Sequence, residues 1–178
     1  MKFSLDCIIR IAEQDYDFTT LVKSLTAVSG DNLYAKNWTG TLLLRIDGQE
    51  YARDIDDPVV RLLGQWLSKI PWILSGDTET VAFRNSEHCF AFVPAGDGVE
   101  ISFYVGSDSE IEDYIFEPTT IRFDLFIKES LRIGDSLINC IKAADAQCLE
   151  KDEDCRDLRT ALDEAKKSWR DYQVHQRR

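Results

Sequence analysis

The chain has 178 residues and a net charge of -11, with 44% hydrophobic and 30% charged residues, which fits one soluble domain with a full core and excludes a disordered chain. No apolar run reaches the roughly 18 residues that a membrane helix requires. Asp6 and Arg10 interrupt the apolar N-terminus, so we expect an unprocessed cytoplasmic protein with no membrane partner.

The first predicted elements are a strand, a helix and a hairpin. Apolar and polar residues alternate over 3–12, which indicates a half-buried strand. Asp17 is the expected cap of the helix that follows, and Gly30 is its expected stop. The stretch TGTLLLRIDGQEYARDI predicts a hairpin that turns at its Asp-Gly pair, because both residue types tolerate a positive φ. The apolar face of the helix consists of Leu21, Leu25 and Val28.

A second helix and a group of strands come next. Asp57 is expected to cap the helix, Pro58 to occupy its first turn and Pro71 to limit it. Turn residues between the strands that follow favour an antiparallel meander. The apolar stripe of the helix comprises Val59, Leu62, Leu63, Trp66, Leu67 and Ile70. The three or four predicted strands are ETVAFRN, HCFAFVP, GVEISFYVG and the less regular EDYIFEPTTI.

The pattern becomes helical at Phe123 and stays so to the end of the chain. Two apolar seams indicate two helices joined by the polar turn LEKDED. The seams comprise Phe126, Ile133, Leu137, Cys140 and Ala144, and then Cys155, Leu158, Leu162, Ala165, Trp169 and Tyr172. We therefore predict a single α+β domain over 1–178, with an antiparallel meander packed by helices. Residues 1–121 are mainly strands with two helices, and residues 122–178 form a C-terminal two-helix hairpin.

Residues 134–137 spell Gly-Asp-Ser-Leu, the signature of a hydrolase family. The serine of that family stands at a strand-to-helix turn near the start of the chain, where backbone donors face the substrate. Ser136 instead falls inside a helical pattern, and His175 follows Asp171 at four residues where the family has three. We expect no catalysis by Ser136, and we expect Gly134 to allow a neighbouring helix to approach.

The thiols and His88 offer little further chemistry. His88 and Cys89 are neighbours on a predicted strand, so their side chains point to opposite faces and do not form a catalytic pair. The cysteines are odd in number and contain no C-x-x-C pair, which favours reduced thiols in the core. They are Cys7, Cys89, Cys140, Cys148 and Cys155.

Metal, cofactor and nucleic-acid sites are not indicated either. The acids of DIDDP resemble the start of a calcium loop, but Val59 and Gln65 stand where such a loop has Gly and Glu. We expect Asp54, Asp56 and Asp57 to supply a helix cap and solvated charges. No phosphate loop or dinucleotide motif occurs, so we predict no cofactor. The basic residues of the last helix alternate with acids, which argues against nucleic-acid binding.

The negative charge is concentrated in one part of the chain. Residues 85–121 contain eight acids and no Lys or Arg, so they carry -8 of the net charge of -11. Solubility and protection of a sheet edge are one explanation. The functional interpretation is a surface that attracts a basic protein partner. The acids are Glu87, Asp97, Glu100, Asp108, Glu110, Glu112, Asp113 and Glu117.

Within this block, the strand GVEISFYVG separates into an apolar face and a face of Glu100, Ser102 and Tyr104. We expect the second face to point outward. Tyrosine offers contact area at little entropic cost, and carboxylates pair with Arg or Lys. We therefore predict a partner-binding site that comprises Glu100, Tyr104, Glu110, Glu112 and Asp113.

The stretches TGTLLLRIDGQEY, DPVVRLLGQWL and GVEISFYVG, in a small acidic α+β chain, resemble the immunity proteins of bacterial toxin systems. The resemblance implies a non-enzymatic inhibitor that binds a basic cognate toxin, commonly a nuclease domain, through its acidic surface. Two other functions remain open. A cytoplasmic adaptor or oligomeric scaffold would use the C-terminal helices as its interface, and an enzyme would use some of the carboxylates. The oligomeric state is not predicted.

Overall fold

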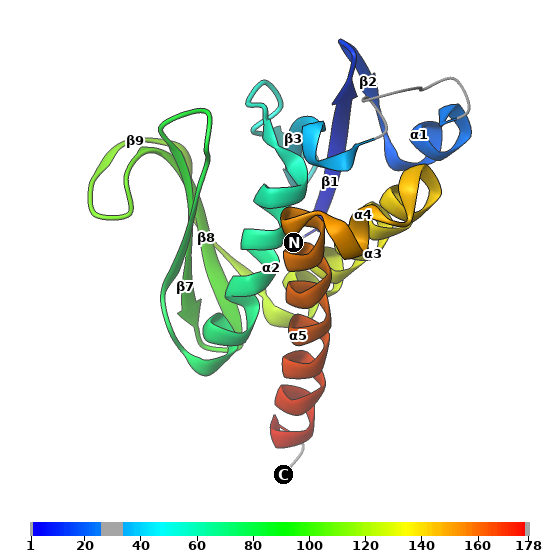
Figure 1. Ribbon diagram of the computed structural model, residues 1–178. Helices are drawn as coiled ribbons and strands as arrows, with labels where there is room; N and C mark the ends of the chain where they lie inside the picture. The colour runs from blue at the N-terminus through cyan, green and yellow to red at the C-terminus, as the bar shows by residue number, and fades with distance from the viewer. Residues whose placement is uncertain (1, 26–33, 177–178) are drawn as a thin grey trace.

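The computed structural model describes residues 2–25 and 34–176 (Figure 1). Its two antiparallel sheets and its helices make up the predicted α+β fold. The strands are β1 (Phe3–Ile11), β2 (Gln14–Tyr16), β3 (Thr39–Ile46), β4 (Gln49–Tyr51), β5 (Asp57–Pro58), β6 (Glu79–Ala82), β7 (His88–Ala95), β8 (Gly98–Gly106) and β9 (Ile111–Arg122). The helices are α1 (Phe18–Ser24), the 3-10 helix η2 (Ala35–Asn37), α2 (Val59–Ser75), α3 (Phe123–Asp145), α4 (Cys148–Lys151) and α5 (Glu153–Gln176).

The first sheet joins the N-terminal strands in the order β2-β1-β3-β4, and β5 pairs with β3. Its predicted hairpin is confirmed, because Asp47 (φ 49°) and Gly48 (φ 91°) form the turn between β3 and β4. The predicted first strand is confirmed as β1. The short strand β2 was not predicted. It follows a turn at Ala12 (φ 50°) and Glu13 (φ 65°), where no glycine signals the positive φ.

Asp17 caps α1 as predicted. Its carboxylate accepts a hydrogen bond from the Thr20 N–H (2.7 Å), and the Thr20 hydroxyl accepts one from the Asp17 N–H (3.0 Å). Leu21 is the buried residue of this helix. The helix α1 ends at Ser24. Val28 and Gly30 of the predicted helix lie outside the described residues.

The predicted meander is the second sheet, with the strand order β6-β7-β8-β9. Its inner face is aromatic: Phe90 and Phe92 are fully buried and meet the ring of Trp66 edge-on, at 5.1 and 4.7 Å between ring centroids. The last strand, β9, is a twelve-residue edge strand with register irregularities against β8 and mostly exposed side chains. Within the described residues no other strand pairs with its outer edge.

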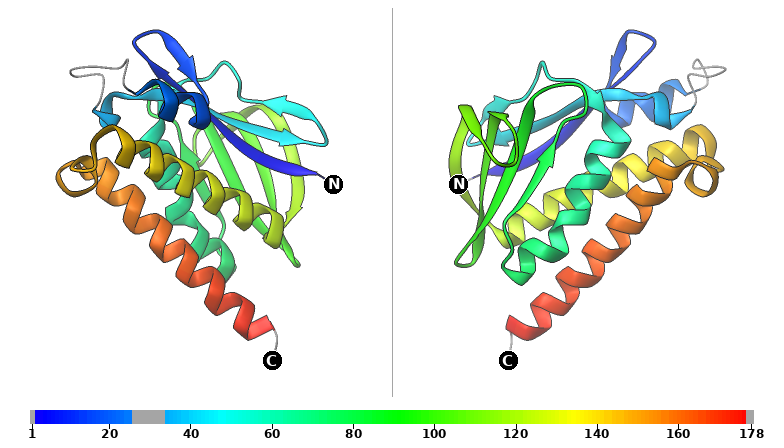
Figure 2. Two further views of the ribbon diagram at one scale, coloured as in Figure 1. Left: turned by 90° about the vertical axis from the view of Figure 1, so that its right-hand side faces the viewer. Right: turned by 60° about the vertical axis from the view of Figure 1, so that its left-hand side comes forward.

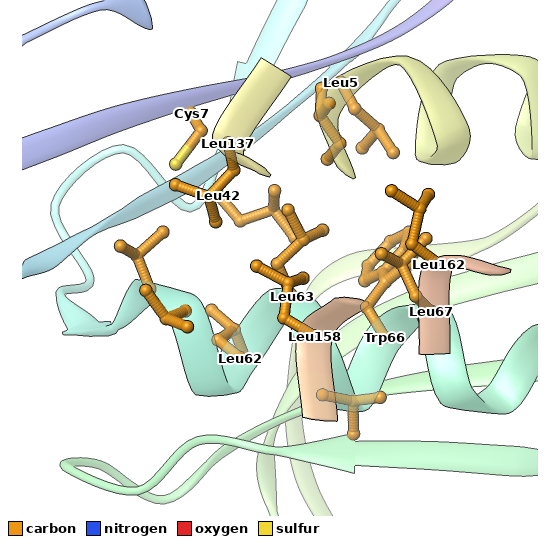
Figure 3. Close-up of a cluster of buried hydrophobic side chains, with 14 of the residues drawn as sticks. Leu5, Cys7, Leu42, Leu62, Leu63, Trp66, Leu67, Leu137, Leu158 and Leu162 are labelled. Atoms are coloured by element: carbon orange, nitrogen blue, oxygen red, sulfur yellow. The ribbon is translucent and has the colours of Figure 1, made fainter. Parts of the chain in front are cut away.

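The core is centred on α2. This helix lies between the meander and α5 (Figure 2), and Leu63, Trp66 and Leu67 of α2 gather with Leu158 and Leu162 of α5 (Figure 3). The predicted C-terminal hairpin is confirmed, because α3 and α5 contact each other, and α5 also lies along α2. The short helix α4 occupies part of the predicted polar turn.

The far end of the α5 seam departs from the rest of the core. The first four seam residues are buried, whereas Trp169 and Tyr172 are half-buried and stack on each other with 5.6 Å between ring centroids. The ring of Tyr172 also meets Phe123 edge-on at 5.6 Å. The seam is therefore core where α5 crosses α2 and is partly solvent-exposed where α5 ends.

Two predictions about α2 are wrong. Asp57 is not its cap, because the N-cap position is Pro58 and no side chain bonds to the first turn. Asp57 belongs instead to β5, opposite Gly40 of β3. Pro71 does not end the helix, which continues to Ser75. Proline removes one backbone hydrogen bond, and buried apolar residues on both sides of it keep the helix on the core.

Candidate partner-binding surface

Five exposed carboxylates gather at one end of the meander. The β6–β7 loop and the β8–β9 turn meet there, because His88 at the start of β7 pairs with Val105 near the end of β8. Both connections lie at the upper left of Figure 1. We call this group the acidic tip. It comprises Glu87, Asp108, Glu110, Glu112 and Asp113, all of them exposed.

Hydrogen bonds hold the acidic tip in place. The Gly106 N–H donates to the Glu87 carbonyl (2.7 Å), which joins the β8–β9 turn to the β6–β7 loop. The Tyr104 hydroxyl donates to the Ser107 carbonyl (3.1 Å), and the Cys89 thiol donates to the Gly106 carbonyl (3.6 Å). Gly106 has a φ of +141°, and a Cβ at this position would overlap the backbone carbonyl of Glu110. The tip is therefore an anchored turn, and its side chains start from defined positions.

No ion pair among the described residues neutralises the charge of the tip. In the described part of the chain, none of the eight acids of residues 85–121 takes part in an ion pair. Two isoleucines of β9 lie among the carboxylates, and Ile111 and Ile115 are 46% and 39% exposed. Aliphatic side chains flanked by charges are typical of a protein-binding surface, since the aliphatic groups give contact and the charges give specificity.

The structure brings three of the five predicted site residues together, namely Glu110, Glu112 and Asp113. Tyr104 lies on the outer face of β8, opposite Cys89 of β7, but its expected exposure is wrong: the residue is 2% exposed because the β8–β9 turn folds over it. Burial raises the pKa of Tyr104 to about 12. The Tyr104 side chain therefore anchors the β8–β9 turn and provides no contact area for a partner.

Glu100 lies apart from the acidic tip. It pairs with Val93 on one side and Thr120 on the other, four residues along β8 from Tyr104. At the usual rise of a strand, this is about 13 Å. Sequence reasoning placed Glu87 in the acidic block but not in the site. No local signal identifies it, because it joins the tip through a loop that lies 19 residues before Gly106.

The Gly-Asp-Ser-Leu tetrapeptide lies in the middle of α3, as expected. The Ser136 hydroxyl donates to the Arg132 carbonyl one turn earlier (3.0 Å), which is a common arrangement for a helical serine. Asp135 forms an ion pair with Lys166 of α5 (2.6 Å). A Cβ on Gly134 would lie 2.9 Å from side-chain atoms of both Leu67 and Leu162. Glycine therefore lets α2 and α5 pack closely on α3, and a larger residue would require the ends of these two leucine side chains to shift.

His88 and Cys89 do lie on opposite faces of β7. The His88 ring stacks on Phe103 on the inner face (5.5 Å between centroids), and burial lowers its pKa. Cys89 is buried on the outer face, and burial raises its pKa. The five cysteines are free and buried, which confirms the prediction of core thiols.

The carboxylates that resemble a calcium loop have separate roles. Asp56 forms an ion pair with Arg10 and accepts a hydrogen bond from the Thr41 hydroxyl (2.9 Å). Asp54 is exposed, whereas Asp57 is buried and bonds to a distant loop. Among residues 2–25 and 34–176, no group of three or more His, Cys, Asp or Glu side chains is arranged to hold a metal ion. In the same residues, no helix combines the length and the apolar character needed to cross a membrane.

Comparison with protein-family models, curated proteins and solved structures gave no match.

Proposed function

We propose that the protein is a non-enzymatic binding protein that docks a basic protein partner through the acidic tip. The observation that carries this proposal is the group of five exposed carboxylates at and beside the anchored β8–β9 turn, which form no ion pair in the described part of the chain and are accompanied by two exposed isoleucines of β9. The resemblance to immunity proteins names the class of partner: a basic toxin domain, commonly a nuclease, met in the cytoplasm.

The electrostatics of the tip suit rapid recognition. Several carboxylates close together on an exposed turn create a local negative potential. Such a potential raises the association rate of a basic partner by about 10- to 1,000-fold at low salt. Because the turn is already anchored by hydrogen bonds, little conformational freedom is lost when the partner binds. The exposed isoleucines then supply apolar contact once the surfaces meet.

Capture of the partner with matched baits tests this proposal. One bait carries Glu110→Lys, Glu112→Lys and Asp113→Lys. The control bait reverses three exposed acids of α5 that form no ion pair within residues 2–25 and 34–176, by Asp157→Lys, Asp163→Lys and Glu164→Lys. Both baits change the net charge equally, so only the position of the charge differs.

We expect a basic protein, for example the product of an adjacent gene, to be captured by the wild type and the α5 control and lost by the tip variant. The proposal fails if the tip variant captures that protein as well as the control does. It also fails if the protein that is captured is acidic, because charge complementarity is then not the basis of binding.

A second candidate function is an oligomeric scaffold. Exposed apolar side chains at the C-terminal ends of α2 and α5 favour it. Trp72 is 58% exposed there and Val174 is 52% exposed. A groove of about 470 Å³ runs between the two helices, lined in part by Leu74 and Tyr172. If these helices form an oligomer interface, Trp72→Arg lowers the molar mass measured by analytical ultracentrifugation. A monomeric wild type at high concentration excludes this candidate.

A further inference from the structure

Asp57 connects two parts of the molecule that are distant in sequence. Its carboxyl group is 1% exposed and lies on β5 of the first sheet. Its Oδ1 accepts hydrogen bonds from the backbone N–H groups of Arg84 (2.8 Å) and Asn85 (2.9 Å) in the β6–β7 loop of the second sheet. A single buried oxygen of the first sheet therefore accepts hydrogen bonds from two backbone donors of a loop in the second sheet.

The same loop holds the acidic tip. Glu87 follows Asn85 by two residues, and its carbonyl accepts the N–H of Gly106 (2.7 Å) from the β8–β9 turn. The hydrogen bonds thus form a continuous path from Asp57 through the loop to the turn. Three of the five tip carboxylates, Glu110, Glu112 and Asp113, lie directly after that turn.

Buried polar atoms without a hydrogen-bond partner are concentrated at this junction. In the described part of the chain, three buried side-chain polar atoms have no hydrogen-bond partner, and all belong to Asp57, to the β6–β7 connection or to the first residue of β7: Asp57 Oδ2, Ser86 Oγ and His88 Nδ1. A buried polar atom without a partner destabilises the folded state. Burial also raises the pKa of Asp57, which means that its ionised form is disfavoured here. Unsatisfied groups concentrated in one place point to a role other than stability.

We propose that Asp57 is the positioning residue of the acidic tip: its buried carboxyl group fixes the β6–β7 loop, and the loop fixes the β8–β9 turn in the arrangement that a partner meets. Its importance for binding rests on the proposed function. The positioning itself does not, because it is a property of the free protein and can be measured without a partner.

Amide hydrogen exchange of the free protein tests the positioning. The measured quantity is the exchange rate of the Gly106 amide divided by that of the Leu67 amide in the centre of α2, which removes any global loss of stability. Three variants are compared with the wild type: Asp57→Ala, Asp57→Asn and Ser130→Ala. Ser130 is a buried control, because its hydroxyl accepts a hydrogen bond from the Trp66 indole N–H (2.9 Å) outside the path from Asp57 to the tip.

We expect Asp57→Ala to raise this ratio at least about tenfold, since a hydrogen-bonded restraint is lost. Asp57→Asn should keep the ratio within about threefold of the wild type, because its amide oxygen still accepts both backbone N–H groups. Ser130→Ala should leave the ratio unchanged. The inference is overturned if Asp57→Ala behaves like Ser130→Ala, or if Asp57→Asn behaves like Asp57→Ala. If Asp57→Ala does not fold, Asp57→Glu replaces it, because the longer side chain moves the oxygen away from the two donors.

The binding consequence is measured separately, with the basic protein that the matched baits capture. Asp57→Ala should slow its association while Ser130→Ala does not. A tip that is released in hydrogen exchange but binds at an unchanged rate shows that positioning by Asp57 does not serve binding, and overturns that part of the inference. The proposed function itself is tested separately, by the capture experiment with the tip and α5 baits.

Discussion

The charges of the first sheet and those of the acidic tip differ in whether they form ion pairs. On the first sheet, Arg45 pairs with Asp6 on β1 (3.0 Å) and with Glu50 on β4 (2.7 Å), and Arg53 also pairs with Glu50 (2.8 Å). The pKa of Glu50 is lowered by its hydrogen bond to Arg45. On the second sheet, the carboxylates of the acidic tip have no such partners in the described residues.

This difference separates charges that stabilise the fold from charges that remain available. Pairs across neighbouring strands stabilise a sheet modestly, and they satisfy the groups that form them. Carboxylates left unpaired on an anchored turn repel one another and give nothing to the fold. The chain places Arg10 and Arg45 against the acids of one sheet and supplies no Lys or Arg within residues 85–121 of the other. The contrast is the main physical argument that the tip serves binding.

The largest expected effect is on association. Combining Glu110→Lys, Glu112→Lys and Asp113→Lys should slow binding of the captured basic partner by about 100-fold at low salt. The effect should be much smaller near 0.5 M salt, where the Debye length falls to roughly 4 Å. Stopped-flow measurements over a range of ionic strength check this. An association rate that is unchanged at every salt concentration would mean that the tip acids serve only solubility.

On the paired surface, substitutions should act on stability and not on binding. We expect Arg45→Met to reduce the free energy of unfolding by about 1 kcal/mol, because two partly exposed ion pairs are lost while the apolar stem is kept. Arg53→Met is the matched control, since Arg53 is more exposed and has one partner, and it should cost less than about 0.5 kcal/mol. Urea denaturation measures both. If Arg45→Met slows partner association as the tip variant does, the two surfaces are not functionally distinct.

Asp57→Asn should change the pH dependence of stability, and this effect should be smaller than that of Arg45→Met on the free energy of unfolding. Because burial raises the pKa of Asp57 in the folded state, the folded protein binds its proton more readily than the unfolded chain does. The contribution of Asp57 to stability therefore falls as the pH rises above its ordinary pKa. We expect the variant to equal the wild type near pH 3 and to gain relative stability as the pH rises toward 7. Melting temperatures that differ equally at every pH would contradict this.

The smallest expected effect is the relief of repulsion within the tip. Glu112→Gln with Asp113→Asn should raise the free energy of unfolding by a few tenths of a kcal/mol at low salt, about the size of surface charge effects in general. The gain should disappear near 0.5 M salt, because the repulsion of the wild type is then screened. Thermal denaturation at two salt concentrations measures it. A loss of stability would show that these carboxylates have partners that hold the turn.

Much of the fold could be predicted because its signals are local. Alternation over β1, the Asp-Gly turn and the apolar stripe of α2 each reflect a periodicity that neighbouring residues impose on the backbone. The wrong predictions concern residues whose environment is set by contacts beyond the local pattern. Asp57 sits in a cap-like position in sequence, yet its carboxyl group is used by backbone donors 27 and 28 residues away. Tyr104 follows the strand pattern, yet the turn that follows β8 covers it.

The candidate site divides in the same way. The sequence by itself determined that residues 85–121 carry a large unbalanced negative charge, that their strands form a meander and that Ser136 lies in a helix, because composition and periodicity do not depend on distant contacts. Only the tertiary structure decided that Glu87 joins Glu110, Glu112 and Asp113 while Glu100 stands apart, since strand register and loop contacts set those distances. It also decided that Tyr104 is an anchor, because the exposure of a side chain depends on what folds over it.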